Sequence, residues 1–131
     1  MPDQAHRDLA AYRLENARTM LADARTLTDA GSYKSGNNRA YYAIFHAVRA
    51  LLALEGLDFK KHSAVIAHFQ NQYVRTGIFG KEYSSILAKA STIRNDSDYN
   101  DFFIASREDT QKQIENADKF ITAIEEYMGR I

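Results

Sequence analysis

Residues 38–52 read Asn38-Arg39-Ala40-Tyr41-Tyr42-Ala43-Ile44-Phe45-His46-Ala47-Val48-Arg49-Ala50-Leu51-Leu52, and this stretch decides the fold. Its apolar side chains recur at spacings of three and four, which is the period of a helix buried along one side. The same spacing brings a second set onto one polar face: Arg39, Tyr42, His46 and Arg49. We therefore predict a helix with an apolar face and a face that carries two guanidiniums, a phenol and an imidazole.

The composition favours a single all-α domain over residues 1–131. The chain has one proline, at position 2, no cysteine and little alternating β-branched sequence, so we predict an antiparallel bundle of about five helices. No apolar run approaches the roughly 20 residues that cross a membrane, and the N-terminus does not begin like a signal peptide. We expect a cytoplasmic protein.

The charge balance limits any nucleic-acid role to a local surface. The 17 Lys and Arg residues equal the 17 Asp and Glu residues, whereas a protein that grips a long nucleic acid by its phosphates usually has a basic excess. Binding would need a local cluster or a groove between subunits.

Periodicity predicts three other helices, over residues 5–30, 63–75 and about 81–94 or slightly beyond. A final helix follows Ser106 and runs to about residue 128. Gly31, Gly56 and Gly77 follow three of the apolar repeats and fit helix ends. Residues 32–37 are expected to form a short polar connection, and residues 94–101 are rich in side chains that favour helix ends and turns.

Four residues are candidates for helix caps. Ser35 or Asn37 would begin the second helix, Ser63 the third, and Ser106, with Asp109 three residues later, the last.

Two further expectations concern surfaces. The outward side of the first helix carries Arg13, Arg18 and Arg25 among other charges, and we predict that it is solvated. The aromatic residues Tyr41, Phe45, Phe102 and Phe103 exceed what one small core would hide, which favours a dimer.

Common catalytic patterns are absent from the sequence. It contains no phosphate-binding glycine loop, no His-Glu-x-x-His zinc pattern and no Gly-x-Ser-x-Gly turn. The four histidines do not share ligand spacing on one helix, so we expect no metal site and no cofactor.

The face with Arg39, Tyr42, His46 and Arg49 allows two interpretations. It is either a solvated or ion-paired surface, or a phosphate-binding surface in which arginine supplies charge and tyrosine or histidine stacks or transfers protons.

A second polar cluster spans residues 94–99. Arg94 and Asp98 are four residues apart, so they can form an ion pair if the helix continues. One interpretation is a structural ion pair beside an aromatic residue. In the other, Arg94 binds an anion or a transition state, Tyr99 supplies a hydroxyl, and Asp98 positions Arg94 or acts as a base.

Three motifs in order resemble the HEPN family of small helical domains, over nearly the whole chain. The first is the Asn-Arg-x-Tyr-Tyr-Ala-x-Phe-His run of residues 38–46. The second is the Lys61-His62-Ser63 turn. The third is the Arg-x-x-x-Asp-Tyr element of residues 94–99.

The resemblance implies a bundle of four or five helices that pairs into a homodimer. Many such proteins are similar to metal-independent endoribonucleases, often toxins encoded beside a nucleotidyltransferase antitoxin. Their site is implied to lie in a cleft between subunits, where two copies make a locally positive groove. Lys61, His62 and Asn95 then join Arg39, Tyr42 and Arg49 of the second helix as expected binding residues for RNA or a nucleotide.

The active motif of the family is an arginine, four to six residues and a histidine, often with a tyrosine just after. Arg94 and Asn95 match its beginning and Tyr99 is retained, but Asp98 stands where histidine is expected. The expected catalytic set is therefore Arg94, Asp98, Tyr99 and, in place of the missing histidine, His46. Two functions remain open: a ribonuclease toxin, or a non-catalytic module that docks or assists a nucleotidyltransferase.

Overall fold

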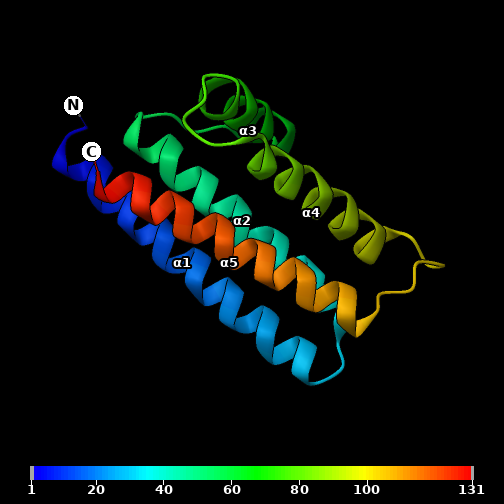
Figure 1. The fold of residues 1–131 in the computed structure, drawn as a ribbon. Coiled ribbons are helices and arrows are strands. Elements are labelled where there is room, and N and C mark those ends of the chain that lie inside the picture. The colour runs from blue at the N-terminus through cyan, green and yellow to red at the C-terminus, as the bar shows by residue number, and fades with distance from the viewer. Residues whose placement is uncertain (1, 131) are drawn as a thin grey trace.

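The structure is a computed structural model that describes residues 2–130, in which five α-helices and one π-helical turn account for the regular elements (Figure 1). They are α1 (Gln4–Asp29), α2 (Tyr33–Leu54), α3 (His62–Phe69), the π-helical η1 (Gln70–Val74), α4 (Lys81–Tyr99) and α5 (Arg107–Gly129). The predicted all-α bundle is confirmed. None of the helices described is long and apolar enough to cross a membrane.

Helix α2 is the centre of the bundle. The helices α1 and α5 pack against it from one side, and α3 and α4 pack against it from the other, where α4 also contacts α5 (Figure 1). Its residues 43–45, 47, 48 and 50–53 are buried around nearly the whole helix. Tyr41 and Phe45 are thus 0% and 6% exposed, so they fill the core of one chain and give no reason for a dimer. Phe102, at 93%, is exposed and Phe103 is half-buried, and the dimer stays a prediction.

The connection between α1 and α2 is shorter than predicted. Gly31 takes a φ of +83°, and the Ser32 amide donates to the Leu27 carbonyl, so the chain reverses within three residues. Because α2 then begins at Tyr33, Ser35 and Asn37 lie inside the helix, and their prediction as caps is wrong.

The third helix also begins earlier than predicted. Its N-cap is Lys61, so Ser63 lies in the first turn and does not cap the helix. The α-helix ends at Phe69, and the widened turn of η1 follows where a continuous helix was expected. This turn buries Tyr73, whose ring centroid lies 6.0 Å from that of Phe69.

Helix α4 continues through residues 95–99, where the sequence predicts a turn. Polar side chains of this segment bond to α2 rather than to their own backbone: Asn37 Nδ2 donates to Ser97 Oγ at 3.2 Å, and Asn38 Nδ2 donates to Asp98 Oδ2 at 2.9 Å. These bonds remove the competition that would otherwise end the helix. The predicted cap at Ser106 is confirmed, since its Oγ accepts from the Asp109 amide at 3.1 Å.

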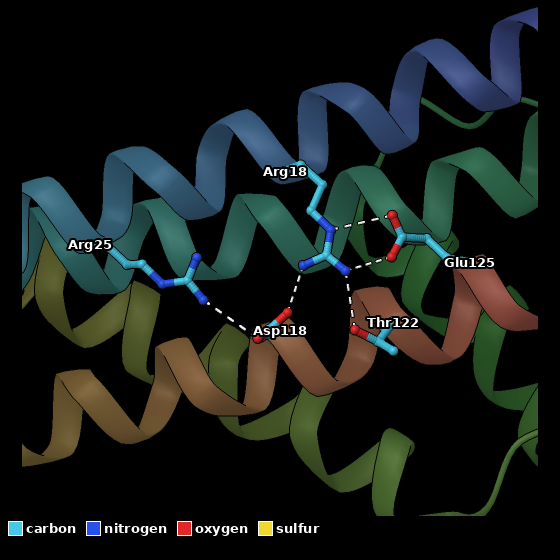
Figure 2. Close-up of polar contacts among 5 residues, drawn as sticks. All are labelled: Arg18, Arg25, Asp118, Thr122 and Glu125. Carbon is cyan, nitrogen blue, oxygen red and sulfur yellow. Dashed lines mark hydrogen bonds and ion pairs between the residues drawn. The ribbon is translucent and has the colours of Figure 1, made fainter.

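The prediction of a solvated charged face on α1 is wrong for Arg13 and Arg18. Arg13 is only 8% exposed. Arg18 reaches α5, where it donates to both oxygens of Glu125, to Asp118 at 2.6 Å and to Thr122 at 3.1 Å (Figure 2). This network joins the first and last helices.

Candidate functional site

Arg94 is held between α4 and the aromatic side of α2. Its guanidinium carbon lies 4.8 Å from the ring centroid of Tyr41 and 5.7 Å from that of Tyr42, a range in which a cation is attracted to a ring face. Its side chain is 12% exposed. The α4 register therefore places a nearly buried cation on two tyrosine rings.

The hydrogen-bonding groups of Arg94 are incompletely used. Its Nη1 lies 3.7 Å from Asp98 Oδ2, which is an ion pair longer than a hydrogen bond. Its buried Nε has no partner among residues 2–130. Burial lowers the pKa of Arg94, but Tyr42, Tyr41 and Asp98 outweigh burial and raise the pKa overall. The site thus holds a permanent cation that still has donors to give.

His62 joins this cluster from the first turn of α3. Its Nδ1 lies 3.0 Å from the Tyr41 hydroxyl, and its ring stacks on Phe45 with centroids 4.1 Å apart. Burial, followed by the charges of Arg94 and Arg49, lowers the pKa of His62. The imidazole is therefore neutral at pH 7 and can accept a proton.

His46 lies further along α2. Its ring centroid is 6.4 Å from that of Tyr42, and its Nδ1 is buried without a partner among the described residues. Burial lowers the pKa of His46, and the nearby charges of Arg49 and Arg13 lower it further. Tyr42 thus stands between His46 and Arg94, so the structure does not bring these two directly together.

Asp98 connects the cluster to a groove at the beginning of α2. This groove, of about 600 Å³, is lined by Arg39, Asp98 and Tyr99 together with Asn38 and other residues. Tyr99 is 75% exposed. Its hydroxyl is therefore in solvent and is not fixed beside Arg94.

The other expected binding residues are dispersed around the Arg94 cluster and the groove beside Asp98. Asn95 and Lys61 are exposed, on α4 and at the cap of α3. Arg49 lies towards the other end of α2, where its Nη2 is 3.4 Å from Asp58.

Sequence reasoning missed two members of the cluster. Tyr41 is named only within a motif and among the aromatic residues expected to exceed the core, yet its ring lies against the Arg94 guanidinium and its hydroxyl lies within hydrogen-bond distance of His62. Asn38 is quoted only as part of a motif, yet it holds Asp98. The available signal was the pair of amide side chains, Asn37 and Asn38, shortly before two adjacent tyrosines. Such polar side chains early in a helix need hydrogen-bond partners from another part of the chain.

The residues described include no group of three or more His, Asp or Glu side chains arranged to hold a metal ion. The expected lack of a metal or cofactor remains a prediction.

Comparison with known proteins gives a family and several relatives. The family model described as the HEPN domain matches residues 10–127. A UPF0332 protein of Thermotoga maritima is 37% identical, over 87% of this chain and 86% of the relative. A protein of Methanocaldococcus jannaschii named "Putative toxin MJ0605" is 32% identical, over 90% of this chain and 87% of the relative.

Proposed function

We propose that this chain, which belongs to the HEPN family, is a single domain that forms a homodimer, binds RNA through the α2–α4 face and cleaves it without a metal ion. One observation carries the proposal: Arg94 is 12% exposed, rests on two tyrosine rings and keeps an unused buried donor. A guanidinium in this state is suited to a phosphate, whose oxygens can take several of its N–H groups at once.

The reaction proposed is attack by a ribose 2′-hydroxyl on the adjacent phosphate. The 2′-oxygen forms a bond to phosphorus, the bond to the 5′-oxygen breaks, and the products end in a 2′,3′-cyclic phosphate and a 5′-hydroxyl. Arg94 would stabilise the charge of the phosphorane. A base must take the 2′-proton and an acid must protonate the departing 5′-oxygen.

His62 is the best-placed base within one chain. It is neutral at pH 7, and it is joined to Arg94 through the Tyr41 hydroxyl and ring. His46 is the second choice, because Tyr42 separates it from Arg94. Tyr99 is 75% exposed, so the described part of one chain does not fix its hydroxyl beside the reacting phosphate.

The test is cleavage of tRNA and of total RNA in EDTA. Wild-type protein is compared with Arg94→Ala, Arg94→Lys, His62→Gln and a control, Arg75→Ala, which removes an exposed arginine at the end of η1. We expect at least about a 100-fold loss of rate in Arg94→Ala, the effect of removing a transition-state donor. Arg94→Lys should restore little of the cleavage rate, because an ammonium cannot donate the two parallel hydrogen bonds of a guanidinium. Arg75→Ala should cleave RNA like wild type.

Binding is measured separately by fluorescence polarisation with labelled single-stranded RNA in EDTA. Absence of cleavage in both wild type and Arg94→Ala, with RNA binding retained, would leave a binding protein and remove the nuclease. Absence of binding as well would refute the whole proposal. Thermal melts of each variant exclude loss of the fold as the cause.

The homodimer is tested by size-exclusion chromatography with light scattering. A strict monomer at micromolar concentration, with or without RNA, would contradict a site shared between two subunits.

A second candidate is the non-catalytic module that docks a nucleotidyltransferase, and a different observation favours it. The chain between α4 and α5 projects from the bundle (Figure 1), and within it Phe102 and Ile104 are 93% and 88% exposed beside the exposed Tyr99. Exposed apolar residues this close together are typical of a binding surface. Co-purification with a neighbouring gene product that Phe102→Ser and Arg39→Ala weaken would support this function, and a neighbourhood without a nucleotidyltransferase gene would argue against it.

A further inference from the structure

A small, largely enclosed cavity lies between α2, α4, α5 and the segment that joins α4 to α5. Its volume is about 170 Å³, and all four of these elements contribute to its lining. A cavity of about 150 Å³ is enough to hold one benzene molecule. This cavity therefore has room for a single substituted ring.

Two buried amide side chains line the cavity. They are Asn37 of α2 and Gln113 of α5, each 3% exposed. Asn37 Nδ2 donates to Ser97 Oγ at 3.2 Å, but Asn37 Oδ1 is buried and has no partner among residues 2–130. A buried acceptor without a partner lowers stability. A ligand that donates an O–H or N–H group to Asn37 Oδ1 would remove that cost.

The segment between α4 and α5 supplies an apolar wall. Phe103 and Ala105 line the cavity, whereas Ile104 between them is 88% exposed, so alternate side chains of this segment face inward. Ile93 adds an apolar side chain from α4. The segment projects from the bundle (Figure 1), so a short connection covers this side of the cavity. The apolar wall favours a hydrocarbon ring over water.

The rim of the cavity has more positive than negative charge. Lys89 of α4 and Lys112 of α5 both line it and are exposed, and Asp109 supplies one carboxylate. The ion pairs formed within residues 2–130 include neither lysine. Two ammonium groups beside one carboxylate attract a ligand with a single negative charge.

We infer that this cavity binds a small aromatic carboxylate that carries a hydroxyl group on the same ring. The carboxylate lies between Lys89 and Lys112, the ring contacts the apolar wall, and the hydroxyl donates to Asn37 Oδ1. The inference does not depend on RNA cleavage, because neither Arg94 nor His62 lines this cavity.

The test is an NMR titration at pH 7.0 and low salt that follows backbone and side-chain amide signals. The probes are 3-hydroxybenzoate and 4-hydroxybenzoate, with benzoate and 4-hydroxybenzamide as references that lack the hydroxyl and the charge. We expect the signals of residues 37, 103, 105 and 113 to shift. One of the two hydroxybenzoates should bind about threefold to tenfold more tightly than either reference, because each reference loses one polar contact.

Variants separate the contacts. Lys89→Gln and Lys112→Gln should each weaken binding about twofold to fivefold, as suits one exposed charge, while the control Lys81→Gln, at an exposed lysine that begins α4, should leave the affinity unchanged. Asn37→Ala should remove the preference for hydroxybenzoate over benzoate. Ala105→Leu should abolish binding, because the larger side chain fills the cavity.

The inference fails if neither hydroxybenzoate shifts these signals up to about 10 mM, well above the range expected for a ligand of this size, since the cavity then holds water alone. It also fails if either reference binds as tightly, or if both lysine variants bind like wild type. These exposed lysines decide the matter even if Asn37→Ala does not fold. Loss of RNA cleavage with retained hydroxybenzoate binding would count only against the function proposed for Arg94.

Discussion

Replacing Gly36 by alanine is expected to destabilise the protein, although alanine is the better helix former. Gly36 lies in the first turns of α2, and a Cβ atom there would meet Thr28 Oγ1 at 2.5 Å and Thr110 Cγ2 at 3.1 Å. Both threonines are buried, at 2% and 0% exposed. Thr28 cannot rotate away without cost, because its hydroxyl donates to the Ala24 carbonyl at 2.8 Å.

The expected magnitude follows from two opposing effects. Forcing one extra carbon into a close-packed site costs about 2–3 kcal/mol at such a short distance, and replacing glycine by alanine within a helix returns about 1 kcal/mol. The net loss is about 1–2 kcal/mol. The unfolding entropy scales to about 0.28 kcal/mol/K for 131 residues, so Tm should fall by about 4–7 °C.

The assay is thermal unfolding followed by circular dichroism. It compares Gly36→Ala, Thr28→Ala and the double variant, with Gly129→Ala as a matched control, since a Cβ at that helical glycine meets nothing within 4 Å. Removing the Thr28 hydroxyl should recover about 1 kcal/mol in the double variant, a coupling expected only for residues in contact. A rise in Tm for Gly36→Ala, or simple additivity in the double variant, would refute the close approach of α1 and α2.

Two further predictions concern the charged groups. Arg18→Met should lower Tm by about 4 °C, because the α1–α5 network loses about 1 kcal/mol, and this loss should shrink in 1 M NaCl, where exposed ion pairs are screened; an unchanged loss in salt would contradict an electrostatic role. The pKa values of His46 and His62 are lowered on folding, so the unfolded chain binds more protons below about pH 6.5. The free energy of unfolding should therefore be highest above that pH and fall as the pH is lowered towards 5. The fall should be smaller in His62→Gln, and melting curves of the two proteins at each pH measure the difference.

The helices were predictable because their signals are local. Apolar repeats specify α1, α2 and α5, and the glycines at positions 31, 56 and 77 take φ values of +83°, +70° and +85°, which terminate helices wherever the chain must turn. The errors arose where distant residues override local preference. The segment 95–99 is helical because Asn37 and Asn38 bond to its side chains, and no pattern within that segment records these partners.

The site was predictable in part for the same reason. Spacing alone brings Arg94 and Asp98 to one helix face and predicts their ion pair. The register between α4 and α2 is set by packing, and it places Arg94 over Tyr41 and beside His62 rather than beside His46. The pairing of both Arg13 and Arg49 with the Asp58 carboxylate could not be predicted either. Arg13 belongs to a helix whose polar positions resemble an ordinary solvated face.

The position of α2 between two groups of helices has a dynamic consequence. Since α3 and α4 rest on one side of α2 while α1 and α5 pack on the other, a partial opening can lift α3 and α4 away together and leave α1, α2 and α5 as a folded three-helix remainder. Amide hydrogens of α2 would then exchange with solvent only on complete denaturation, and those of α4 sooner. A ligand that contacts both Arg94 on α4 and the tyrosines on α2 would hold the two helices together. Its binding should therefore slow deuterium uptake in α4, and the degree of slowing would report how much of the protein is bound.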